Sequence, residues 1–130
     1  MSLWEKEKGT GGKLLILKAY VQIAEGLVGG ALLSQIVYWH RPNASGESKL
    51  KVKRHDRFWI AKDQKTWCEE CFISPAQFGR ARRKLQSIGL IEVRSMMFHG
   101  CKVLHIALNM AELESLVDQQ LHQSELAESI

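Results

Sequence analysis

Residues 74 to 77, Ser-Pro-Ala-Gln, constrain the fold of this chain more than any other feature, because they have the composition of a helix start. The Ser74 hydroxyl can accept a hydrogen bond from a backbone N–H of the first turn, and Pro75 suits the first helical position. The Gln77 side chain can reach back to the Ser74 backbone N–H and complete a capping box. Gly89 follows the last residue of the apolar pattern and adopts the left-handed conformation without steric cost, so the helix is predicted to end there.

This predicted helix is amphipathic and basic. Apolar side chains recur along it at helical spacing and form a stripe suited to packing on a core, while cations occupy the other faces. An Arg on an exposed helix face is suited to hydrogen bonding with guanine in the major groove of DNA. The stripe is Phe78, Ala81, Leu85 and Ile88, the cations are Arg80, Arg82, Arg83 and Lys84, and the residues furthest from the stripe are Ala76, Gly79, Arg80, Arg83 and Ser87.

A second helix is predicted directly before the basic one. Asp63 is a suitable N-cap, and Trp67 and Cys71 then share one face of the helix. Phe72 and Ile73 are expected to fill the turn between the two helices.

Two strands are predicted after the basic helix. Leu90 to Arg94 alternates apolar with polar residues, Phe98 to Gly100 has the composition of a turn, and the alternation resumes over residues 103–108. These segments form a hairpin whose tip is Ser95 to Lys102.

The first half of the chain is predicted to supply the central helix. Leu14 to Leu17 is compatible with a short strand or with a first helical turn, and a weak helical pattern from Ala19 stops at Gly26. A stronger pattern over residues 31–40, before Pro42, is apolar on more than one face, so we expect this helix to be buried on several sides.

A turn and a short strand should connect this helix to the next. Asn43 to Glu47 is predicted to be a turn, and the alternation in Lys49 to Arg57 is typical of an edge strand or of a mobile basic loop. Phe58 to Ile60 is predicted to be a strand.

Positive charge is concentrated around the basic helix. The net charge of the chain is +4, but Lys49 to His105 holds 13 Lys and Arg against 5 Asp and Glu, a net charge of +8. Ile106 to Ile130 has a net charge of −5. This distribution suits binding to a phosphate backbone, although a solvated basic face would have the same composition.

Composition argues for one domain in a reducing compartment. A chain of 130 residues, 45% hydrophobic, suffices for a single core. No run approaches the roughly 18 apolar residues of a membrane span, and the N-terminus lacks the apolar segment of a signal peptide. Three cysteines cannot all pair internally. We expect a cytoplasmic protein that does not contact membranes.

Catalysis, metals and cofactors are not expected. Cys68 and Cys71 with His99, Cys101 and His105 could supply four zinc ligands, but the spacing of the second half is irregular and cysteine is commonly a small buried hydrophobe. The sequence has neither a recognised nucleophile motif nor a phosphate-binding loop. We therefore expect a non-enzymatic protein without a cofactor, a metal or a small-molecule substrate.

Several segments resemble the winged helix-turn-helix DNA-binding proteins of phages, plasmids and integrated mobile elements, including replication-initiation and replisome-organiser N-terminal domains. The resemblance covers about Leu14 to Asn109. The segments that carry it are Ala31 to Trp39, Phe58 to Lys62, Trp67, Ile73 to Phe78 and Arg83 to Glu92.

The resemblance implies a recognition helix over residues 75–88 and a wing formed by the hairpin. Carried onto this chain, it implies contacts with double-stranded DNA from Gln77, Arg80, Arg83 and Lys84, with Lys102 contributed by the wing. The apolar segment Met96 to Phe98 departs from the usual basic wing tip and favours a protein interface there.

The expected organisation is an α+β winged-helix domain over residues 14–109, between a flexible N-terminus (1–13) and an acidic amphipathic helix and tail (110–130). The domain should bind duplex DNA for replication initiation or transcriptional regulation, and both roles stay open. The alternative is a winged helix used as a protein-interaction module. The apolar stripe Leu113 to Leu121 either forms a homodimer or folds back beside Ala31 to Trp39.

Overall fold

The computed structural model describes residues 13–128, with side chains described for residues 17–123. Over this range the fold is α+β, with five helices and one four-stranded antiparallel sheet. The predicted flexible N-terminus lies outside the described residues except for Lys13. The elements are α2 (Lys13–Ala24), α3 (Leu27–His40), β1 (Val52–Arg54), β2 (Arg57–Ala61), α4 (Gln64–Cys71), α5 (Pro75–Ser87), β3 (Ile91–Phe98), β4 (Cys101–Leu108) and α6 (Met110–Glu128).

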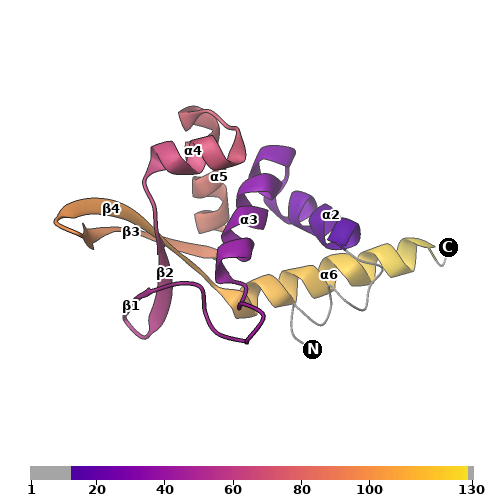
Figure 1. Ribbon diagram of the computed structural model, residues 1–130. Coiled ribbons are helices and arrows are strands. Elements are labelled where there is room, and N and C mark those ends of the chain that lie inside the picture. The colour runs from indigo at the N-terminus through magenta and orange to yellow at the C-terminus, as the bar shows by residue number, and fades with distance from the viewer. Residues whose placement is uncertain (1–12, 129–130) are drawn as a thin grey trace.

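Helices α2, α3 and α5 pack together on one side of the sheet, and the β3–β4 hairpin projects away from them (Figure 1). The strand order is β1-β2-β4-β3. Ile106 of β4 pairs with Ile60 on one side and with Val93 on the other, and these side chains join the helical core. Residues 49–57, left open between an edge strand and a basic loop, contain an edge strand over Val52–Arg54.

Helix α3 is the predicted central helix. Leu32, Leu33, Ile36 and Val37 cover more than one of its faces and are all buried. The segment over residues 14–17, left open between strand and helix, belongs to α2. Helices α2, α4 and α5 all pack on α3.

Helices α4 and α5 begin at the predicted caps. Asp63 Oδ1 accepts the Thr66 N–H at 2.8 Å. Hydrogen bonds from the side chain and the backbone of Thr66 lower the pKa of the Asp63 carboxyl. Ser74 Oγ accepts the Gln77 N–H at 3.1 Å, and Gln77 Oε1 accepts the Ser74 N–H at 2.8 Å, so the capping box is complete. Both helix starts are therefore confirmed.

The turn between α4 and α5 differs from the prediction. Phe72 does not fill it, because this residue ends α4 in the left-handed conformation and its side chain is 95% exposed. Ile73 is partly buried against the core, as expected.

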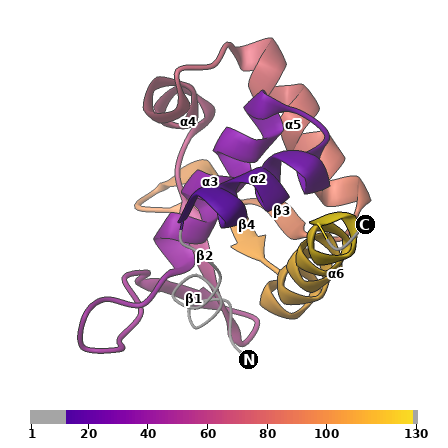
Figure 2. The ribbon, with the colours of Figure 1, turned by 90° about the vertical axis from the view of Figure 1, so that its right-hand side faces the viewer.

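Helix α6 occupies most of the predicted C-terminal segment 110–130 and packs chiefly against α2 (Figures 1 and 2). Leu113 and Val117 are fully buried within the same chain, so α6 folds back on its own domain, as one of the two predicted alternatives had it. Its packing partner is α2 and not the predicted helix α3. None of the described helices is both long and apolar enough to cross a lipid bilayer.

Candidate nucleic-acid interface

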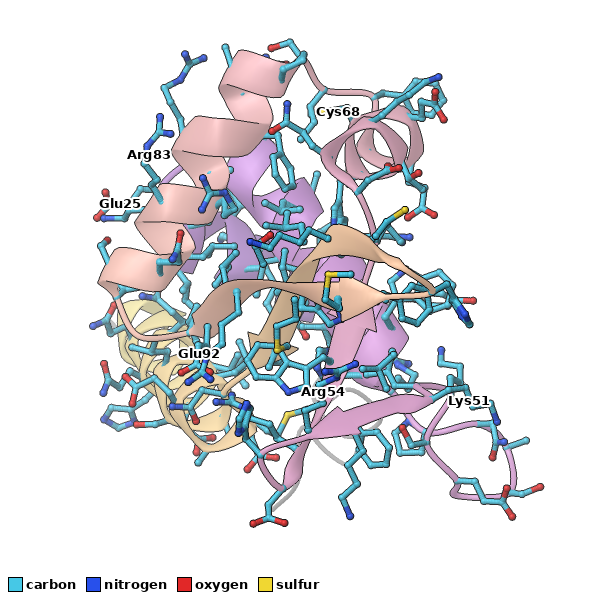
Figure 3. All side chains as sticks on the ribbon, turned by 90° about the vertical axis from the view of Figure 1, so that its left-hand side faces the viewer. Glu25, Lys51, Arg54, Cys68, Arg83 and Glu92 are labelled. Carbon is cyan, nitrogen blue, oxygen red and sulfur yellow. The ribbon has the colours of Figure 1, made fainter. Side chains whose placement is uncertain are left out.

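The buried stripe of α5 determines which of its side chains face solvent. Phe78, Ala81 and Leu85 are buried, and Ile88 packs partly against the same core. Four of the five residues predicted to lie furthest from the stripe are exposed, and Figure 3 shows Arg83 pointing away from the molecule. These four residues are Ala76, Arg80, Arg83 and Ser87.

Gly79, the fifth residue, is half-buried beneath a cation of its own helix. A Cβ added at Gly79 would lie 3.1 Å from Nη1 of Arg83, so the glycine lets the guanidinium lie close to the helix backbone. Arg80 and Arg83 have no carboxylate partner among the side chains of residues 17–123. Both guanidinium groups are thus available to bind an anion.

The other two predicted residues of α5 are already engaged. Lys84 Nζ lies 2.9 Å from Oε2 of Glu25, and the Gln77 carbonyl oxygen is used in the capping box. An exposed ion pair of this kind is worth about 0.2–1 kcal/mol, so a phosphate could compete for Lys84 at small cost.

The α2–α3 turn and α5 form a groove of about 440 Å³. Gln77, Arg80 and Lys84 line one wall, and Glu25 and Leu27 lie on the other. Leu27 is 79% exposed, and Glu25 has a left-handed backbone with φ 59°. Sequence reasoning missed both residues, because only the packing of α2 and α3 against α5 brings this turn beside the basic helix.

Lys102 is exposed, but it is not close to the arginines of α5. It pairs with Met97 near the hairpin turn, whereas α5 leads into the opposite end of the hairpin at Ile91. Ile91 and Met97 are six positions apart along β3, which corresponds to roughly 20 Å of strand. Arg54 Nη2 donates to the Met97 carbonyl at 3.0 Å and ties β1 to the hairpin end. The predicted contacts thus form two separate sites.

The thiols lie in different environments. Cys68 and Cys71 pack partly against the core, and burial is the main cause of the raised pKa of the Cys71 thiol, whereas Cys101 is exposed on β4. Among the described residues, no three His, Cys, Asp or Glu side chains are grouped as a metal site would require.

Comparison with protein-family models, curated proteins and solved structures returned no match to this chain.

Proposed function

We propose that residues 14–109 form a winged-helix domain that binds double-stranded DNA with α5 as its recognition helix. The order of α3, β2, α4, α5 and the β3–β4 hairpin supports this assignment, because it places a helix-turn-helix before a hairpin. The observation that carries the proposal is the exposed pair Arg80 and Arg83, which face away from the buried stripe of α5.

The chemistry of this face suits the major groove. An Arg fork can bind O6 and N7 of guanine with two hydrogen bonds, and the small exposed residue Ala76 allows the helix backbone to approach the bases. Lys84 and Lys102 would add phosphate contacts, the first by leaving Glu25 and the second from the wing. Gln77 would position the helix start and contact DNA only through its free amide nitrogen.

In this proposal the protein is a cytoplasmic, non-catalytic DNA-binding protein without a cofactor or a small-molecule substrate. It serves a mobile element in replication initiation or in transcriptional regulation. Either role requires the duplex contacts proposed for α5.

The test is the double variant Arg80→Ala/Arg83→Ala in a duplex-DNA titration. We expect at least a tenfold loss of affinity, because each good Arg–guanine contact is worth about 1–3 kcal/mol. Thermal stability should be nearly unchanged, because exposed substitutions usually shift it by about 0.5 kcal/mol. Lys18→Ala removes an exposed cation from α2 and serves as the control. Unchanged duplex affinity in the folded double variant would reject the proposal.

Salt dependence separates this function from the alternative of a protein-interaction module. If binding neutralises about five phosphates, log K for duplex binding should fall against the logarithm of the salt concentration with a slope near −4 to −5. The alternative is favoured by Met97, which is 49% exposed near the hairpin turn, but Leu113 and Val117 belong to the chain's own core. A flat salt response would support the protein-interaction module.

A further inference from the structure

A second basic surface lies around the edge strand. Lys49, Lys51 and Lys53 alternate with Leu50, which is buried, and Val52, which is partly buried. Lys51 and Lys53 are exposed and Lys49 is partly exposed, whereas the apolar side chains between them pack inward. Together with the exposed rings of Tyr38 and Phe58, the three lysines form what we call the β1 surface.

Two of these lysines contact the two exposed rings. Lys49 Nζ lies 3.7 Å from the centroid of the Tyr38 ring, and Lys53 pairs across the strands with Phe58, its Nζ 5.8 Å from that ring. Tyr38 is 51% exposed and Phe58 is 37% exposed. Each ring therefore offers aromatic surface to solvent beside a positive charge.

The charges of the β1 surface are not neutralised locally. Among the side chains of residues 17–123, none of the three lysines forms an ion pair with a carboxylate, whereas Lys62 pairs with Glu70 and Lys84 pairs with Glu25. Lysine on an edge strand also discourages strand pairing between molecules, and that role alone would explain the cations. It does not explain two large rings left exposed beside them.

The β1 surface is also distinct from α5. Figure 3 shows Lys51 and Arg83 at opposite sides of the molecule. A ligand bound to the β1 surface would therefore leave the arginines of α5 free.

We propose that the β1 surface binds single-stranded DNA. Aromatic rings bind a single strand by stacking on unpaired bases, and in a duplex the faces of the bases are already stacked on one another. Tyr38 and Phe58 would stack on bases, with a base taking the place of the Lys49 ammonium over Tyr38. Lysines two residues apart, about 7 Å along an extended chain, would follow the phosphates. The choice of DNA over RNA rests on the proposed function of α5.

The test is fluorescence anisotropy with a labelled oligodeoxythymidine, which has no paired bases. Tyr38→Ala/Phe58→Ala should weaken binding at least tenfold, since stacking is worth about 1–3 kcal/mol per base. Tyr38→Phe/Phe58→Tyr keeps both rings and should bind like the unmodified chain. Phe72→Ala removes a ring that is 95% exposed and has no lysine over it, so it should leave the affinity unchanged.

A second variant tests the proposal independently, in case the aromatic double variant misfolds. Lys49→Gln/Lys51→Gln/Lys53→Gln should make the slope of log K against log salt shallower by about 2 for the single strand. An oligodeoxythymidine that does not bind, or that binds all of these variants like the unmodified chain, would overturn the proposal. Equal or tighter binding of oligouridine would overturn the assignment to DNA.

The variant Arg80→Ala/Arg83→Ala separates the two proposals. It should lose duplex affinity and keep its affinity for oligodeoxythymidine within about twofold. Loss of both affinities would mean one shared site and would overturn the β1 proposal. Intact duplex affinity with ring-dependent single-strand binding would reject only the function proposed for α5.

Discussion

A single carboxylate, Glu25, reduces the positive charge that α5 can offer to DNA on its groove side, because Glu25 forms an ion pair with Lys84 at 2.9 Å. Glu25→Gln should raise duplex affinity a few-fold, since it frees Lys84 to contact a phosphate. Glu69→Gln changes the net charge equally on the exposed face of α4 and should have a smaller effect. A duplex titration checks this, and a gain that persists in a Lys84→Gln background would contradict it.

His40 is a partly buried base that joins α3 to β4. Its Nδ1 donates to the Ile36 carbonyl at 3.0 Å, and its Nε2 accepts the Leu108 N–H at 3.3 Å, so the ring must be neutral. Burial lowers the pKa of His40 below its usual 6.5, and the nearby Arg57 lowers it further. The unfolded chain therefore takes up this proton first as the pH falls.

The stabilising contribution of His40 is complete above about pH 6.5 and is lost as the pH falls through the lower pKa of the folded state. We expect His40→Gln, which cannot titrate, to lose less unfolding free energy between pH 7.5 and pH 5.5 than the unmodified chain. Urea denaturation at the two pH values measures this difference. Identical losses of unfolding free energy in both chains would show that His40 does not contribute to the pH dependence of stability.

At the scale of elements, the close approach of α2 and α3 depends on Gly30. A Cβ at this position would lie 2.6 Å from Val21 Cγ2 and 3.0 Å from Val21 Cα, so no change of side-chain rotamer could relieve the contact. Gly30→Ala should destabilise the fold by roughly 1 to 2 kcal/mol, because the strain exceeds the gain of about 1 kcal/mol in helix propensity.

Gly26→Ala is the matched control in the same helical hairpin. A Cβ at Gly26 would meet no atom within 4 Å, and its φ of 161° is extended backbone that any residue adopts. Its unfolding midpoint should stay close to that of the unmodified chain. Should Gly30→Ala prove as stable as Gly26→Ala, the inferred close packing of α2 and α3 would be wrong.

At the scale of the whole molecule, α6 uses its apolar stripe inside the chain. Leu113→Asp should therefore unfold or strongly destabilise the protein, because it buries an unpaired charge. Ser115→Asp adds the same charge on the exposed face of α6 and should be tolerated. Sedimentation equilibrium with circular dichroism checks this, and a dimer that Leu113→Asp separates into folded monomers would restore the stripe as a dimer interface.

The sequence by itself determined features that depend on residues within one or two helical turns. The caps at Asp63 and Ser74, the end of α5 before Gly89 and the exposure of Arg80 and Arg83 are of this kind. Each follows from side-chain hydrogen bonds over three residues or from the periodicity of a helix, so no distant partner is needed.

Only the tertiary structure decided which distant residues meet. The pairing of Glu25 with Lys84, the packing of α6 on α2 and the position of Lys49 over Tyr38 join elements that carry no local signal of one another. The physical reason is that these contacts depend on how the helices pack and on which strands pair, and many arrangements satisfy the same local periodicity. The groove beside α5 and the β1 surface therefore became visible only in three dimensions.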